Sequence, residues 1–321
     1  MYQEELLHLL QKEIPQNASL IDAVAIALEI SYDAAHRRVS LKSKFSLDET
    51  ILLAKYYNLS IDRLFETTTS NFVAVEKTKN IGNEDDLILY LEESYASLAP
   101  LSKQKNINLL YSAKDIPLFY TVSDDILGRF KMYVWLKLLD KSYTAKSFEK
   151  FTPRIALVQA GNKLAALYNT ISKSEIWDIT TINSTLKQIH FYFEAGQLNA
   201  ESALTLCDQL NKLITDITSK MIHDSNYQIY YNELHLMNNN VLVSTPSTQV
   251  LYVPFTLLSY YKTSDKLTCK EAGIFLEKQL NESKLLNTVG EKERNSFFNK
   301  IHTKIEALKQ LINASNILDF E

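Results

Sequence analysis

The 321-residue sequence predicts a mainly α-helical protein in two parts. A small bundle of short helices comes first, and a larger α+β domain with a small antiparallel sheet follows. Only six Gly and six Pro residues interrupt the chain, which favours long helices over a turn-rich β-sandwich. Apolar residues make up 46% and charged residues 22%, a balance typical of globular proteins and not of disordered chains. Residues rich in β-branched and aromatic side chains after position 226 predict the strands.

Five short helices are predicted within the first 66 residues. Residues 2–13 form an amphipathic helix that ends before Pro15, because the residue preceding a proline avoids helical backbone. Serine N-caps and apolar residues at helical spacing indicate four more helices, over residues 20–28, 32–41, 47–58 and 60–65. The connection Glu29-Ile30-Ser31 between the second and third is only three residues long, which predicts a helix-turn-helix.

Particular residues in this segment carry a family resemblance. Ala25 lies inside the second helix, Ile30-Ser31 forms the turn, and the alanine-rich third helix ends in Arg37-Arg38. Together with the pattern of Ser46–Phe65, this resembles the lambda-repressor-like (Cro/Xre-type) family of bacterial transcription regulators. The family usually has Gly where this chain has Glu29, because that residue takes a positive φ. A non-Gly residue there costs about 1 kcal/mol.

The resemblance covers residues 1–66 and implies a DNA-binding domain. A polar, Thr/Ser-containing linker over residues 67–86 is expected next, followed by a regulatory or dimerisation domain over residues 87–321. Further helices are predicted in that domain over residues 87–98, 124–140, 155–172, 180–195, 200–223, 257–262, 269–286 and 292–312. Strands are predicted over residues 107–112 and 118–121, and an antiparallel meander over residues 227–234, 240–244 and 249–255.

Positive charge is concentrated in one short stretch of the predicted DNA-binding domain. The whole chain has a net charge of −4, and residues 1–66 are themselves net acidic, so the protein does not coat nucleic acid generally. Between Ala34 and Leu47, however, there are four cations and one histidine with no acidic residue. Phosphate affinity depends on the local field at the contact surface, so this stretch is the candidate DNA contact. A solvated basic face without a partner is the alternative.

The resemblance implies that the start of the third helix faces the major groove. It assigns base reading to Tyr32, Asp33, His36 and Arg37. Arg37 is the strongest candidate, because a guanidinium binds guanine O6 and N7 bidentately. Asp33 would either accept from a cytosine amino group or cap the helix. The predicted contacts to the DNA backbone are Ser31, Arg38, Lys42 and Lys44.

No catalytic signature occurs in the sequence. A GxSxG, Walker, GxGxxG or HExxH motif is missing, and the histidines are scattered, so we predict neither an enzyme nor a metal or cofactor site. The aromatic stretches Tyr227–Tyr231 and Tyr252–Tyr261 could line a small-molecule effector pocket or belong to the core. The apolar series from Phe297 to Ile312 is either core or a dimer contact.

The sequence therefore predicts a cytoplasmic, one-component transcription regulator that binds double-stranded DNA as a homodimer. Cys207 and Cys269 lack metal-ligand spacing and are expected to be reduced core residues. The sequence has no run of about 18 apolar residues, so we expect no membrane helix. The N-terminus lacks the features of a secretory signal. The alternative function is a scaffold whose N-terminal helices bind a protein partner.

Overall fold

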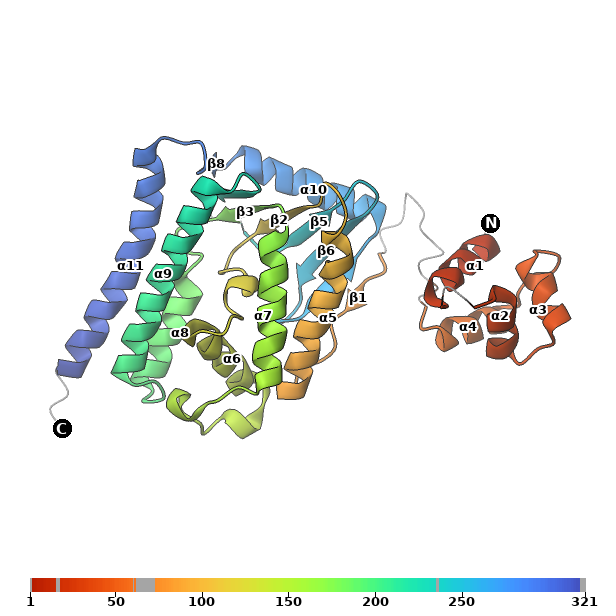
Figure 1. The fold of residues 1–321 in the computed structure, drawn as a ribbon, viewed down its shortest axis with the longest axis horizontal. Helices are drawn as coiled ribbons and strands as arrows, with labels where there is room; N and C mark the ends of the chain where they lie inside the picture. The colour runs from red at the N-terminus through yellow and green to blue at the C-terminus, as the bar shows by residue number, and fades with distance from the viewer. Residues whose placement is uncertain (1, 16–17, 60, 62–72, 235–236, 318–321) are drawn as a thin grey trace. The chain divides into compact units, whose positions relative to one another are not determined.

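The computed structural model describes residues 2–15, 18–59, 61, 73–234 and 237–317. The chain divides into two compact units, Met1–Ala74 and Val75–Glu321 (Figure 1). Residues 67–72 of the predicted linker lie outside the described residues. The later part of that linker contains a short strand, β1 (Glu76–Lys77), which pairs with the sheet of the second unit.

The first unit contains four described helices around a small apolar core. These are α1 (Tyr2–Glu13), α2 (Leu20–Leu28), α3 (Tyr32–Val39) and α4 (Leu47–Tyr56). The serine hydroxyls predicted as N-caps of α2, α3 and α4 all accept a backbone N–H of the first helical turn. The fifth predicted helix, over residues 60–65, lies outside the described residues apart from Ile61. The fully or nearly fully buried core side chains are Leu6, Leu7, Leu10, Val24, Ala35 and Leu53.

These helices do not show a clear helix-turn-helix, so this part of the predicted fold class is wrong. The sequence pattern contains capping residues and apolar spacing, which determine helix ends and buried faces. It does not determine the angle at which neighbouring helices cross, which depends on how their side chains interdigitate. The turn itself has the backbone expected from the pattern, since Glu29 is left-handed with φ 54° and ψ 41°.

The second unit is built on an eight-stranded mixed sheet, and the prediction of a small antiparallel sheet is wrong. Its strand order is β1-β7-β6-β5-β2-β3-β4-β8. The central strands β2, β3 and β4 are parallel to one another, and every other pairing is antiparallel. The bounds of the strands after β1 are β2 (Asn108–Ser112), β3 (Lys173–Trp177), β4 (Tyr227–Tyr231), β5 (Val241–Ser244), β6 (Gln249–Pro254), β7 (Tyr260–Thr263) and β8 (Lys284–Leu285).

Two local errors explain the difference in the sheet. The predicted meander placed residues 227–234 next to residues 240–244, whereas β4 pairs in parallel with β3, a strand the sequence did not predict. Residues 257–262 were predicted as helical, but Tyr260–Thr263 form β7 and pair with β6. The true meander is β5-β6-β7. Pairing partners of parallel strands are distant in sequence, so local periodicity does not identify them.

Helices cover both faces of this sheet. Successive residues of a strand point to opposite faces. Leu110 and Ile176 pack with Cys269 and Leu276 of α10 on one face, while Leu109 belongs to the main core on the other. In Figure 1, α5 and α7 lie side by side, as do α9 and α11. The helices are α5 (Glu84–Ser102), α6 (Ile126–Leu139), α7 (Ile155–Thr170), α8 (Asn183–Glu194), α9 (Ala200–His223), α10 (Lys266–Asn281) and α11 (Glu291–Ile317).

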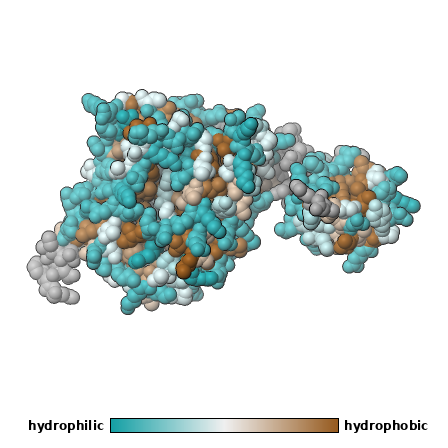
Figure 2. Space-filling model, viewed as in Figure 1, coloured by the Kyte–Doolittle hydropathy of each residue, from teal (hydrophilic) through white to brown (hydrophobic). Residues whose placement is uncertain are grey.

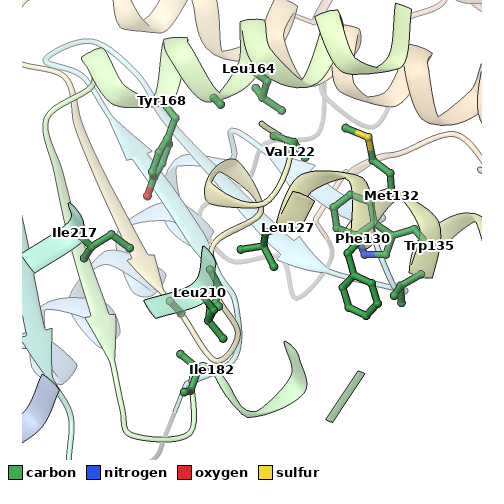
Figure 3. Packing of buried hydrophobic residues seen from close by; sticks show 14 of the residues in the cluster. Val122, Leu127, Phe130, Met132, Trp135, Leu164, Tyr168, Ile182, Leu210 and Ile217 are labelled. Carbon is green, nitrogen blue, oxygen red and sulfur yellow. The ribbon is translucent and has the colours of Figure 1, made fainter. Parts of the chain in front are cut away.

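The main core lies around α6, in which every residue from Leu127 to Leu136 except Arg129 is buried. Figure 3 shows Leu127 and Phe130 of α6, Leu164 of α7 and Leu210 of α9, which are all buried in the same cluster. The apolar series of α11, including Phe297 and Ile301, belongs to the same core. The structure thus places this series, apart from the exposed Leu311, in the domain core, one of the two alternatives the sequence left open. None of the described helices is both long and apolar enough to cross a membrane.

Candidate nucleic-acid interface

The four residues predicted to read bases share the exposed side of α3. Ala35 is completely buried against the other helices of the unit, which turns Tyr32, Asp33, His36 and Arg37 to solvent. The rings of Tyr32 and His36, one helical turn apart, stack with their centroids 6.5 Å apart and an interplanar angle of 10°. This face therefore presents one cation and one flat aromatic pair.

The loop after α3 carries two of the predicted phosphate contacts and is held against α1 by Gln3. The side-chain amide of Gln3 donates to the carbonyl oxygens of Arg38 and Ser43, both at 2.9 Å. Its carbonyl oxygen accepts the backbone N–H of Phe45 at 3.3 Å. One side chain therefore positions the whole loop, from which Lys42 and Lys44 are exposed.

Arg38 differs from the other predicted DNA contacts because its guanidinium is occupied within the unit. Its Nη2 and Nε donate to the two carboxylate oxygens of Glu49 at 2.5 Å and 3.1 Å, and its Nη1 donates to the carbonyl of Ala34 at 3.0 Å. Glu49 also accepts the backbone N–H of Ser46 at 2.8 Å, completing a capping box. Arg38 thus joins α3 to the start of α4.

The pKa of the Glu49 carboxyl is lowered from its ordinary value, chiefly by the hydrogen bond from Arg38. The charged pair is only partly exposed, at 22% for Arg38 and 19% for Glu49. Partial burial strengthens such a bidentate pair relative to one on an open surface. Arg38 is therefore a positioning residue for α3 in the free protein.

Three of the predicted cations remain available. Among the described residues, Arg37, Lys42 and Lys44 form no ion pair within the chain. Ser31, the fourth backbone candidate, uses its hydroxyl to accept the N–H of Ala34 at 3.3 Å and so caps α3. Asp33 lies in the first turn of α3, where a carboxylate is favoured by the helix dipole.

Glu175 of β3 is completely buried and lies at the centre of a hydrogen-bonded cluster in the second unit. Its carboxylate accepts hydrogen bonds from the hydroxyls of Tyr120 and Tyr168, both at 2.6 Å, and of Tyr227 at 3.1 Å. The indole N–H of Trp177 donates at 2.8 Å. Four donors therefore satisfy the oxygens of this buried side chain, and two of them, Trp177 and Tyr227, lie on β3 and β4.

Two lysines of the second unit are almost completely buried. Burial lowers the pKa of Lys131 to about 8, and its Nζ donates to Thr185 and Gln188 at 3.2 Å and 2.8 Å. Burial also lowers the pKa of Lys173 to about 8, and its Nζ donates to backbone carbonyls. Within the described ranges, no three His, Cys, Asp or Glu side chains are arranged to hold a metal ion.

The aromatic stretches considered as pocket linings have separate locations. Tyr227 belongs to the Glu175 cluster and is completely buried. Tyr252 and Tyr260 line a cavity of about 310 Å³. The ring of Tyr261 packs on Phe255 instead, with centroids 4.5 Å apart.

Sequence reasoning missed Gln3 and the role of Glu49. The Ser46-x-x-Glu49 spacing of a capping box was a usable signal for Glu49. Its pairing with Arg38, and the contacts of Gln3 about 40 residues along the chain, depend on tertiary packing. No protein-family model, curated protein or solved structure matches the chain.

Proposed function

We propose that this protein is a sequence-specific transcription regulator of the one-component type, which binds double-stranded DNA through α3 and the following loop. The observation that carries the proposal is the group of three exposed, unpaired cations, Arg37, Lys42 and Lys44. They lie on the exposed side of a short helix and on a loop held by Gln3. Exposed cations without an internal partner need not break an ion pair before they contact phosphate. When they bind, they displace counterions from the DNA, and the release of these ions favours binding.

The proposed roles follow from the position of each residue. Arg37, on the exposed side of α3, reads a base in the major groove, with Tyr32 and His36 beside it. Lys42 and Lys44 contact phosphates from the loop. Arg38 contributes by holding α3 on α4. The protein is proposed to be cytoplasmic and to act as a homodimer that reads two half-sites about one DNA turn apart.

A second function is favoured by an apolar surface on the same unit. Ile26 of α2 is 64% exposed and Tyr56 of α4 is 59% exposed, and both line a shallow hollow. Exposed apolar side chains that lie together are a feature of protein-binding surfaces. In this alternative, the first unit binds a protein partner through α2 and α4. Apolar residues are visible on the first unit in Figure 2.

Selection from random duplexes, followed by gel shifts of the full-length protein, separates the two functions. We expect an enriched sequence, and we expect Arg37→Ala to weaken binding to it by about 1–3 kcal/mol while relaxing the preferred base at one position. Lys44→Ala should weaken binding to all sequences alike. Lys55→Ala, which removes an exposed cation of α4, is the matched control and should leave both affinity and specificity unchanged.

If Arg37→Ala, like Lys44→Ala, weakens binding to the selected and random sequences equally, the assignment of separate base and phosphate roles is contradicted. If no duplex is retained at any salt concentration while Ile26→Asp abolishes capture of a protein partner, the second function is the correct one. Ile26 is exposed, so this substitution does not bury a charge.

A further inference from the structure

The second unit contains a cavity between α5 and the antiparallel half of the sheet. Its volume is about 310 Å³, which is in the range of small-molecule sites. Strands β1, β5, β6 and β7 contribute to one wall, and α5 forms the opposite one. Polar residues cover most of the visible surface of this unit (Figure 2), so an aromatic interior contrasts with the exterior.

Aromatic rings and hydroxyl groups form the interior of this cavity. Tyr90, Tyr111, Tyr252 and Tyr260 contribute phenol groups. The hydroxyls of Ser97 and Tyr252 hydrogen-bond at 2.9 Å, and the phenols of Tyr111 and Tyr260 lie close enough to influence each other's pKa. These hydroxyl groups offer hydrogen-bond donors and acceptors inside the cavity, and the aromatic rings form flat apolar walls.

Phe119 supplies a rigid aromatic wall. Its ring stacks on that of Tyr168, with the centroids 4.0 Å apart and the planes 4° from parallel. Tyr168 is in turn fixed by its 2.6 Å hydrogen bond to the buried Glu175. A wall fixed in this way loses little side-chain freedom when a flat molecule packs against it.

Charge inside the cavity is balanced or absent. Burial raises the pKa of Tyr90 and Tyr111 above the ordinary value of 10, so both phenols stay neutral near pH 7. Nζ of Lys262 lies 3.1 Å from the carboxylate of Glu76, and Nζ of Lys79 lies 2.5 Å from that of Glu93. The amino group of Lys77 lies over the ring of Phe255, which is not part of the cavity lining. A charged ligand would lose its hydration shell on entering the cavity and would find no unpaired group of opposite charge there.

We infer that this cavity binds an uncharged, planar aromatic molecule that carries a single hydrogen-bonding group. The rings of the walls pack against its faces, and a tyrosine or serine hydroxyl meets its polar group. Strand β1, which forms part of the wall, is the first element of the second unit after the connection from the first unit. This inference is independent of DNA binding, since it concerns only residues of the second unit.

The test uses the full-length protein without DNA and two fluorescent probes with the same carbon skeleton. N-phenyl-1-naphthylamine is uncharged, planar in its fused rings, and has one N–H donor. Anilinonaphthalene sulfonate adds a negative charge to that skeleton. We expect the uncharged probe to bind one site per chain with a gain in fluorescence, and the sulfonate to bind it at least about tenfold more weakly.

A cavity-filling variant locates the bound probe. Ser94 lies on α5 and lines the cavity, so Ser94→Phe places a ring inside it. Ala96→Phe adds the same ring on the exposed side of the same helix and is the matched control. We expect the first to raise the probe Kd at least about tenfold and the second to change it by no more than about twofold.

Circular dichroism of each variant checks that the fold is kept, and Ser97→Leu replaces Ser94→Phe if that variant does not fold. Absence of probe binding in the wild-type protein would overturn the inference. So would unchanged binding in the folded cavity-filling variant, because the probe would then lie elsewhere. Equal or tighter binding of the sulfonate would overturn the assigned class of uncharged ligand.

Discussion

Replacing Arg38 by alanine is expected to loosen α3 from α4 while leaving the exposed cations of α3 in place. The substitution removes two hydrogen bonds to the carboxylate of Glu49 and one to the backbone carbonyl of Ala34, all donated by the charged guanidinium. Glu49 still caps α4 through Ser46, so only the connection between the helices is lost. The adjacent Arg37→Ala removes an exposed cation and no such contact, which makes it the matched control.

The expected loss of stability is about 1–2 kcal/mol. Hydrogen bonds to charged groups contribute about 1.5–3 kcal/mol when buried, whereas exposed ion pairs contribute about 0–1 kcal/mol. With about a fifth of each side chain exposed, this pair lies between those limits. Arg37→Ala should stay within about 0.5 kcal/mol of the wild-type protein, as is usual for surface substitutions.

Native-state hydrogen exchange of the full-length protein, read by mass spectrometry, measures this loss in α3 and α4 separately from the second unit. Exchange in these helices should accelerate by about 5–30-fold in Arg38→Ala. The pKa of Glu49 is lowered in the folded state, so the pair stabilises fully above its ordinary pKa of 4.5 and is lost as pH falls through the lower folded value. Arg38→Ala should weaken this acid dependence. Equal exchange in the two arginine variants would refute the reasoning.

Two further substitutions test other parts of the structure. Glu29→Gly should stabilise the first unit by about 0.5–1 kcal/mol, because residue 29 has a φ of 54° that glycine adopts without strain; slower exchange in α2 would show this, and faster exchange would contradict it. Glu175→Leu should destabilise the second unit by about 3–5 kcal/mol, because it leaves buried phenol and indole donors without their acceptor. Tyr168→Phe removes one of those donors and should cost less in urea unfolding, and an equal cost for both would refute the cluster's role.

The helices of the second unit were largely predictable from the sequence, as were strands β2, β4, β5 and β6, but strands β3 and β7 and the pairing of the sheet were not. Helix α9 matches residues 200–223 because its apolar residues repeat at helical spacing and Gly196 ends the preceding helix. Strand β3 contains lysine, serine and glutamate, yet all five of its residues are buried. Its polar groups find partners from other elements, as Glu175 does from Tyr168. The sequence of the strand alone does not reveal which distant residues will become these partners.

The candidate site was predictable to a similar extent. Exposure of Arg37, Lys42 and Lys44 follows from the buried position of Ala35 and from the polar composition of the loop. The engagement of Arg38 could not be predicted, because Glu49 lies on another helix and its distance depends on how the two helices pack. Two neighbouring arginines with the same local sequence context thus have different surroundings in the structure.

Salt dependence of DNA binding tests the central proposal most directly. For the full-length protein, the logarithm of the association constant should fall linearly with the logarithm of salt concentration, with a slope of about −0.9 for each phosphate contacted. Lys42→Ala combined with Lys44→Ala should reduce the magnitude of that slope by about 1.8, whereas Lys55→Ala should not change it. A wild-type protein without salt-dependent retention, or the same slope in the double variant, would contradict the proposal that α3 and its loop bind DNA.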